Sequence, residues 1–203
     1  SAASDVYKRQ CPCPAAPRSS PTGACRLSAP ITIHKSQGTE IHLYVHIPFC
    51  DRICPYCSFY KHTPGKTDLA RFIAGLRAEA TRRAQQFHSS RLETAYLGGG
   101  TPSMLSPAHL GNLMDGLREI FEFEHRAELN LEANPATFGR ARAEAFARSG
   151  VTRISLGAQS FDREVLKTLG RTHGPDDICR SVDLLRQAGI ENISIDLMFS
   201  IPG

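Results

Sequence analysis

The sequence predicts an α/β fold, a partial parallel (β/α) barrel in which strands and helices alternate. From residue 40 onward, short apolar runs alternate with stretches whose apolar residues recur at helical spacing. That alternation is typical of parallel sheets whose strands are joined by crossover helices. The chain stops at residues 201–203, directly after the fifth such strand. We therefore expect a barrel truncated there, with an open sheet edge.

Each element has its own signal in the sequence. The predicted strands are short apolar runs bounded by glycine, proline or asparagine, and they span residues 41–47, 94–97, 127–133, 151–158 and 193–198. Apolar residues recur with a helical period in residues 69–80, 106–117, 141–149 and 175–188. Ser106 and Pro107 mark one helix start, because serine caps a helix and proline is tolerated at its first position. A further short helical segment is expected just before Leu169.

Composition limits the classes of protein that remain. The chain has 203 residues, 41% hydrophobic and 22% charged, which suits one domain with a sizeable core. Residues 1–40 carry five Lys/Arg against two Asp/Glu, so only +1 of the net charge of +4 lies elsewhere. That distribution argues against nucleic-acid binding. No apolar run approaches the roughly 18 residues of a transmembrane segment.

The first 38 residues differ from the rest. They hold five prolines and show no sustained periodicity, so we predict a disordered or non-native leader over residues 1–38 and a core domain, incomplete at its C-terminal end, over residues 39–203. The leader is also basic and poor in acids, as an organelle transit peptide would be. Clustered cysteines that form no disulfide framework favour a reducing compartment, and we expect a cytoplasmic protein. Cys179, alone in a helical pattern, is expected to be a small buried hydrophobe.

Three cysteines follow the first predicted strand. Cys50, Cys54 and Cys57 form a C-x3-C-x2-C pattern on one loop, and soft thiolate ligands select iron–sulfur clusters or zinc. A [4Fe–4S] cluster normally takes four cysteines, so three would leave one iron open to another ligand. The alternative is a structural zinc ion completed by His46 or His62.

Polar or glycine-rich residues follow each of the other predicted strands, where parallel barrels carry their chemistry. Gly98-Gly99-Gly100 would let backbone N–H groups approach a ligand closely, and Arg171 could bind a carboxylate with its two-pronged guanidinium. The remaining candidates are Thr101, Glu132, Gln159 and Asp196. We therefore expect a polar ligand across the mouth of the barrel.

These motifs resemble those of radical S-adenosylmethionine (SAM) proteins, specifically the oxygen-independent coproporphyrinogen III oxidase-like group. The segment 44–50 with Cys54 and Cys57, and then residues 98–102, 132–135, 159–161, 169–173 and 196–198, match in order and approximate spacing. The resemblance implies a [4Fe–4S] cluster on the three cysteines, with SAM chelating the open iron and cleaved by an electron to methionine and a 5′-deoxyadenosyl radical. The SAM contacts that it implies are Tyr44, Tyr56, Gly99, Gly100, Thr101, Glu132, Gln159, Arg171 and Asp196. No catalytic residue is assigned.

One position separates two functions within this group. Dehydrogenases resemble C-x3-C-x2-C-x-C, whereas this chain has Phe59 in place of the fourth cysteine. The chain therefore resembles the HemW branch of heme chaperones, which implies heme as a ligand, heme-acceptor proteins as partners and a flavodoxin or ferredoxin as electron donor. The alternatives are oxidative decarboxylation of coproporphyrinogen III, which leaves open whether the chain is an enzyme, and a zinc-stapled binding module. Candidate heme ligands are His42, His46, His62, His109, His125 and His173, with His46 expected to be a packed or hydrogen-bonded histidine.

Overall fold

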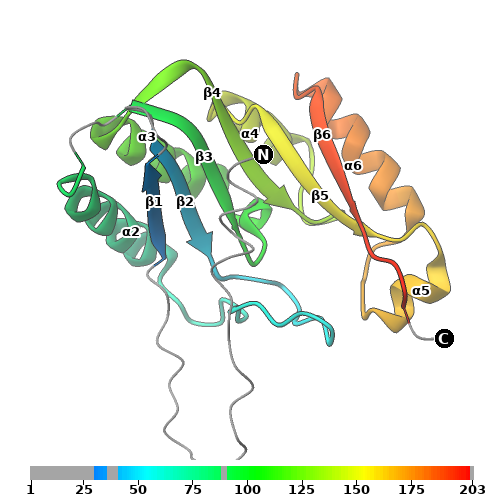
Figure 1. The fold of residues 1–203 in the computed structure, drawn as a ribbon. Helices are drawn as coiled ribbons and strands as arrows, with labels where there is room; N and C mark the ends of the chain where they lie inside the picture. The colour runs from blue at the N-terminus through cyan, green and yellow to red at the C-terminus, as the bar shows by residue number, and fades with distance from the viewer. Residues whose placement is uncertain (1–29, 36–40, 88–90, 202–203) are drawn as a thin grey trace, which may run out of the picture.

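The computed structural model describes residues 30–35, 41–87 and 91–201. A six-stranded sheet in the order β1-β2-β3-β4-β5-β6 forms its centre (Figure 1). β1 pairs antiparallel with β2 and every later neighbour is parallel. The strands are β1 Ile31–Lys35, β2 Ile41–Ile47, β3 Arg91–Gly99, β4 Glu122–Ala133, β5 Arg153–Gln159 and β6 Asn192–Leu197. The predicted α/β fold is confirmed, and the sheet is not closed.

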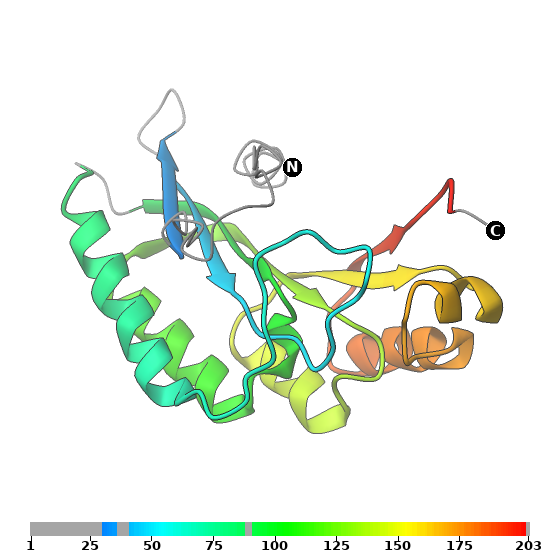
Figure 2. The same ribbon diagram turned by 90° about the horizontal axis from the view of Figure 1, so that it is seen from below.

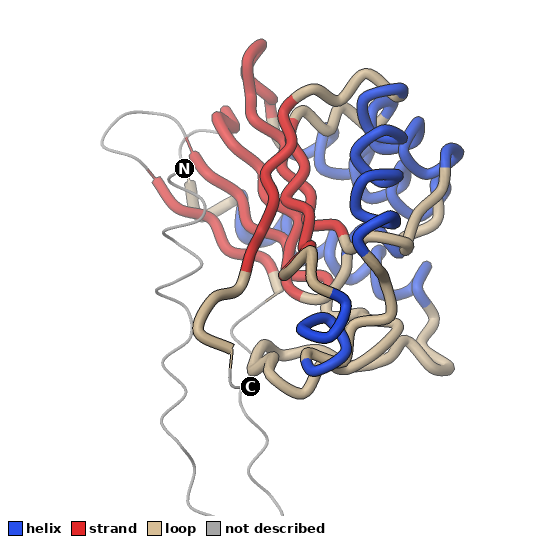
Figure 3. The backbone as a smooth tube through the Cα atoms, turned by 90° about the vertical axis from the view of Figure 1, so that its right-hand side faces the viewer, coloured by secondary structure: helices blue, strands red, loops and turns tan. Residues whose placement is uncertain are grey.

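The longer helices form one layer. Figure 3 shows the helices on one side of the strands, and the layer consists of α2 Leu69–Ala84, α3 Pro107–Ile120, α4 Arg140–Arg148 and α6 Pro175–Gln187. Two shorter elements, the 3₁₀ helix η1 Pro102–Met104 and α5 Arg163–Thr168, follow the carboxyl ends of β3 and β5. The predicted start of α3 is confirmed, because the Ser106 side chain accepts a hydrogen bond from the His109 N–H and Pro107 is the first helical residue.

The predicted disorder of the leader is wrong for one segment. Residues Ile31–Lys35 form β1, which pairs with β2 so that Ile31 lies opposite Val45. The physical reason is alternation: Ile31 is fully buried in the core and Ile33 packs against it. Residues 1–29 and 36–40 lie outside the described residues, and the division of the chain at residue 38 stays a prediction.

The two faces of the sheet differ in chemistry. Leu43, Leu97 and Leu131 point toward the helices and are at most 1% exposed. Their neighbours in sequence point to the opposite face, because side chains alternate along a strand. The parallel register places Tyr44 opposite Tyr96 and Glu132 opposite Ser155 there. We call this polar side the open face. Parallel sheets usually bury two apolar faces. A face lined with polar side chains is therefore a candidate ligand-binding surface.

The helices are short. In the part of the chain that the structure describes, we find no helix with both the length and the hydropathy that crossing a membrane requires.

Candidate functional site

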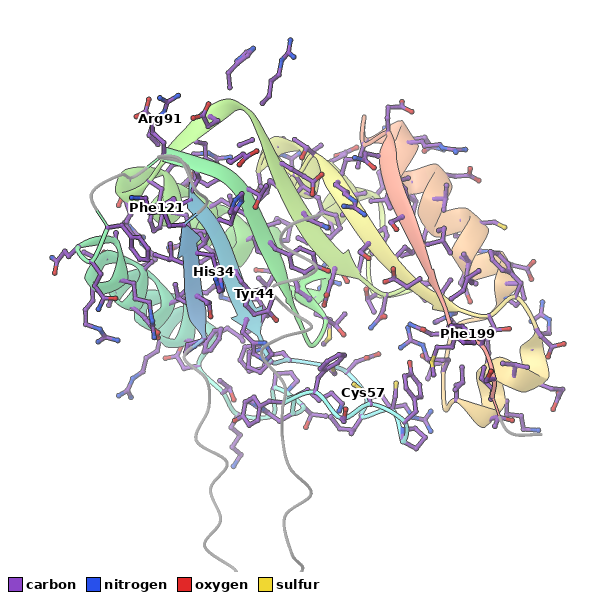
Figure 4. All side chains as sticks on the ribbon, in the orientation of Figure 1. His34, Tyr44, Cys57, Arg91, Phe121 and Phe199 are labelled. Carbon is purple, nitrogen blue, oxygen red and sulfur yellow. The ribbon has the colours of Figure 1, made fainter. Side chains whose placement is uncertain are left out.

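The cysteines lie on a loop that crosses the carboxyl ends of the strands. Figure 2 shows this loop in cyan, between the tip of β2 and the start of α2, and Figure 4 labels Cys57 on it. Two hydrogen bonds join its ends: the Cys50 N–H donates to the His62 carbonyl at 3.0 Å and the His62 N–H to the Pro48 carbonyl at 2.8 Å. Cys50 is buried, whereas Cys54 and Cys57 are partly exposed. The loop is therefore tied to the sheet at its base and exposed farther along.

Hydrogen-bond donors approach the cysteines from outside the loop. The Thr101 hydroxyl donates to Cys50 Sγ at 3.5 Å, and Arg171 Nη1 to Cys54 Sγ at 3.6 Å. Burial and the neighbouring Cys57 and Cys54 raise the pKa of the Cys50 thiol, and the Thr101 hydrogen bond and the charge of Lys61 offset only part of this rise. Donors at sulfur favour thiolates, which are the form that binds metal.

The three cysteines place thiol ligands on one loop, the ligand type that iron–sulfur clusters take. Within the described ranges, no group of three or more His, Cys, Asp or Glu side chains is arranged to hold one metal ion. In a four-iron cluster each thiolate binds a separate iron. One zinc ligand considered from the sequence is engaged: His46 Nε2 donates to the Tyr60 carbonyl and Nδ1 accepts from the Tyr44 hydroxyl, both at 2.9 Å. His46 is thus hydrogen-bonded, as expected, and burial lowers its pKa.

A cavity of about 340 Å³ lies beside the loop, within the size range of small-molecule sites. Of the residues predicted for the site, Tyr44 and Thr101 are absent from its lining. Tyr44 lies deeper on the open face, stacked on Tyr96 with ring centroids 6.0 Å apart, and Thr101 is 1% exposed. The site residues that line the cavity are Cys50, Cys54, Tyr56, Cys57, Gly99, Gly100, Glu132, Gln159, Arg171 and Asp196.

The glycine run contacts the protein itself. The N–H of Gly99 donates to Glu132 Oε2 at 2.9 Å, and the N–H of Gly100 to the Ile47 carbonyl at 2.8 Å. A Cβ atom at Gly100 would lie 2.6 Å from the Phe49 carbonyl oxygen, too close for any side chain. This corrects the expectation that the N–H groups of Gly99 and Gly100 face a ligand, because Glu132 of β4 and Ile47 at the end of β2 accept their hydrogen bonds.

Two carboxylates face the cavity in different settings. Glu132 accepts from the Tyr96 hydroxyl at 2.7 Å as well as from Gly99, whereas both oxygens of the exposed Asp196 lie 2.9 Å from the Ser155 hydroxyl. Burial raises the pKa of Glu132, and its two hydrogen-bond donors lower it. The pair gives the cavity acceptors for ligand hydroxyl or ammonium groups.

Arg171 is already engaged by the protein. In addition to its contact with Cys54, its Nη2 donates to Asn134 Oδ1 at 2.6 Å and to the Gly157 carbonyl at 2.8 Å. Both terminal nitrogens therefore have partners, which corrects the expectation of a two-pronged guanidinium free for a ligand carboxylate. Arg171 still lines the cavity, so a ligand carboxylate there would have to compete with these partners.

The remaining candidates lie at the rim or in the core. Gln159 ends β5 with a φ of +67° and its carbonyl accepts from the Met198 N–H, so it joins β5 to the end of β6. Tyr56 is 37% exposed on the cysteine loop. His173 also lines the cavity, is 5% exposed and donates from Nε2 to the Ala158 carbonyl, so it is a hydrogen-bonded histidine in the cavity wall. Cys179 is exposed on α6, which corrects its predicted burial, because the buried stripe of α6 is formed by Ile178, Ser181 and Leu185.

Sequence reasoning missed three residues. Asn134 joins Thr101 to Arg171, Ser155 holds Asp196, and the Lys61 amine donates to the Cys57 carbonyl at 2.6 Å. Asn134 could have been found from its place at a strand end, two residues after Glu132. For Lys61 and Ser155 the sequence offers no comparable signal.

The fold and the cysteine loop agree with the comparisons. The model of the Radical SAM superfamily matches residues 44–203. The chain therefore belongs to that superfamily, as its motifs indicated.

Individual relatives narrow the resemblance. The heme chaperone HemW of Lactococcus lactis is 41% identical over 79% of this chain and 41% of its own length. HemW of Escherichia coli is 37% identical over 80% of this chain and 43% of its own. The solved structure of the radical SAM enzyme HemN, coproporphyrinogen III oxidase of Escherichia coli, matches with a TM-score of 0.72 and 31% identity, over 78% of this chain and 37% of that one. The chain thus spans about two fifths of the length of these curated relatives.

Proposed function

We propose that this chain is part of a heme chaperone that holds a [4Fe–4S] cluster on Cys50, Cys54 and Cys57, binds SAM beside it, and delivers heme to acceptor proteins. The observation that carries the proposal is the position of the three cysteines, on one loop at the mouth of a cavity that also exposes two carboxylates. In addition, the HemW relatives are named heme chaperones.

The residues around the cavity suit the parts of SAM. Glu132 and Asp196 supply acceptors for ribose hydroxyls or the amino group, and Arg171 supplies a cation near the cysteines for the carboxylate. When bound, the cluster would supply the electron that cleaves SAM. Tyr44 and Thr101 do not line the cavity but contact residues beside it. Tyr44 packs against Tyr96, and the Thr101 hydroxyl donates a hydrogen bond to Cys50.

Heme handling is supported by the residue that stands in place of a fourth cysteine. Phe59 is 38% exposed and lines the cavity, so that position offers an apolar ring where a cysteine would offer a thiol. The proposal includes a flavodoxin or ferredoxin as electron donor and a cytoplasmic location.

The test is to reconstitute the 203-residue chain anaerobically with iron and sulfide and to titrate it with hemin. We expect a heme absorption band that saturates, followed by transfer of the heme to an apo-acceptor such as apomyoglobin. Cys179→Ala should behave as the unchanged chain, since Cys179 is exposed on α6. A chain that assembles the cluster but leaves hemin free in solution would refute heme binding by this part of the protein.

One observation favours a second function, the oxidative decarboxylation of coproporphyrinogen III. The match to HemN carries this alternative. Incubating the loaded chain with SAM, a reductant and coproporphyrinogen III decides between the two. Protoporphyrinogen formed together with methionine and 5′-deoxyadenosine, measured by mass spectrometry, would establish the oxidase, and heme binding without conversion would support the chaperone.

A further inference from the structure

Asn134 has a fixed position directly after β4. Its N–H donates to the Ser103 hydroxyl at 3.3 Å, and its carbonyl accepts from the Thr137 hydroxyl at 2.7 Å. Gly157 lies against its side chain, where a Cβ atom would come within 2.7 Å of Asn134 Oδ1. The backbone hydrogen bonds and the contact with Gly157 therefore fix the position of the side-chain amide.

The partners of this amide determine its orientation. Arg171 can only donate, so Oδ1 must face its Nη2 at 2.6 Å, and Nδ2 then donates to Thr101 Oγ1 at 2.9 Å. Because the Thr101 hydroxyl accepts this bond and is buried, its single hydrogen is directed to Cys50 Sγ. One amide thus orients two donors at once.

Each of these donors reaches a different cysteine. Thr101 contacts the sulfur of Cys50, and Arg171 contacts the sulfur of Cys54. Lys61, by contrast, reaches the carbonyl oxygen of Cys57. The hydrogen bonds therefore form one continuous chain between two sulfurs, and Asn134 is its central member.

We infer that Asn134 is a positioning residue for the cluster, which rests on the proposed binding of [4Fe–4S] by this loop. Its side chain holds Thr101 and Arg171 as hydrogen-bond donors to the sulfurs of two cysteines that bind the cluster. It thereby raises the reduction potential of the cluster. Hydrogen bonds to sulfur stabilise the more negative, reduced state, and residues that orient ligands from outside tune metal sites. Asn134 thus sets how readily the cluster accepts an electron.

The test compares Asn134→Leu, which keeps the size of the side chain and removes both hydrogen bonds, with Asn130→Leu. Asn130 is the matched control, because it is a buried asparagine four residues earlier in β4. In the reconstituted 203-residue chain, a redox titration followed by electron paramagnetic resonance should give a more negative midpoint potential for Asn134→Leu and an unchanged one for Asn130→Leu. Resonance Raman bands of the iron–thiolate bonds should move in Asn134→Leu alone. Equal potentials in all three proteins would overturn the inference.

A double variant separates positioning from a general change in polarity. If Asn134 acts through Thr101, the potential shift of Thr101→Val combined with Asn134→Leu should be smaller than the sum of the two single shifts. Additive shifts would contradict the inference. Should Asn134→Leu hold no cluster, Thr101→Val against Thr101→Ser decides, because serine keeps the hydroxyl: a negative shift in valine alone supports the chain of bonds, and equal potentials refute it.

The outcomes also separate this inference from the proposed function. If the unchanged chain assembles no [4Fe–4S] cluster, the proposed function fails. If the chain assembles the cluster and Asn134→Leu leaves its potential unchanged, only the role of Asn134 fails.

Discussion

Leu131 and Glu132 are neighbours in β4 but belong to opposite sides of the sheet. Leu131 is fully buried against the helices, whereas Glu132 lines the cavity on the open face. The helix-covered side contributes burial of apolar surface, the main stabilising term in folding. The open face instead presents polar groups held by hydrogen bonds. The helix-covered side therefore stabilises the fold, and the open face carries the polar groups of the candidate site.

The largest effect is expected from the cysteines, and it should leave the helix-covered side intact. Replacing Cys50, Cys54 or Cys57 by alanine should abolish the cluster absorption at about 400 nm, because each thiolate binds one iron. Far-ultraviolet circular dichroism should remain that of the unchanged chain. Cys179→Ala serves as the control and should retain the absorption. Retention of the band in all three loop variants would remove the cluster from this loop.

The opposite result is expected from Leu131→Ala. Truncation of this fully buried side chain should lower the free energy of unfolding by about 2 to 5 kcal/mol, since it loses apolar burial and leaves a cavity. Denaturant unfolding followed by circular dichroism measures the change. Leu197→Ala, at a residue 59% exposed in β6, should change stability by no more than about 0.5 kcal/mol. Similar losses in both variants would show that burial of Leu131 against the helices does not account for its contribution to stability.

A smaller effect is expected at the cation beside the cysteines. Arg171→Ala should weaken SAM binding to the cluster-loaded chain by about 1.5 to 3 kcal/mol, the range for a hydrogen bond to a charged group. Isothermal titration calorimetry gives the affinity directly. Arg163→Ala is the matched control, because Arg163 pairs with the exposed Asp176 on the surface. Equal affinities in the two variants would place Arg171 outside the SAM site.

The smallest effect concerns pH and the open face alone. Burial raises the pKa of Glu132 in the folded chain, so between its ordinary value and the raised one the folded state binds more protons than the unfolded state. The free energy of unfolding should therefore fall as pH rises through that window. Glu132→Gln should lack this decline when denaturant unfolding is compared at about pH 5 and about pH 8. Parallel pH profiles for the two proteins would show that the Glu132 pKa is not raised.

Much of the fold could be predicted because local patterns determine it. The period of apolar residues identified α2, α3, α4 and α6, and short apolar runs identified β2 to β6. β1 was missed because its alternation lies in a segment assigned to the leader from its composition. The exposure of Cys179 was missed because cysteine was taken for a buried hydrophobe, although Cys179 lies outside the buried stripe that contains Ile178 and Leu185.

The site could be predicted in position but only partly in contacts. Because parallel strands end at one edge, the strand-end rule correctly gathered most of the candidates around one cavity. The partners of Arg171 and of the glycine N–H groups depend on how separate loops pack together, which no local spacing encodes. For the same reason the place of Asn134 at a strand end marks it as a candidate but does not predict its contacts, which come from Thr101, from η1, from β5 and from the segment after α5.

The two hydrogen bonds at the base of the cysteine loop lower the entropic cost of ordering it. They join Pro48 and Cys50 to His62, so the chain already closes a ring there. Most of the entropy of loop closure is thus lost when the sheet forms, so ordering residues 51–61 costs less than closing a free loop of that length would.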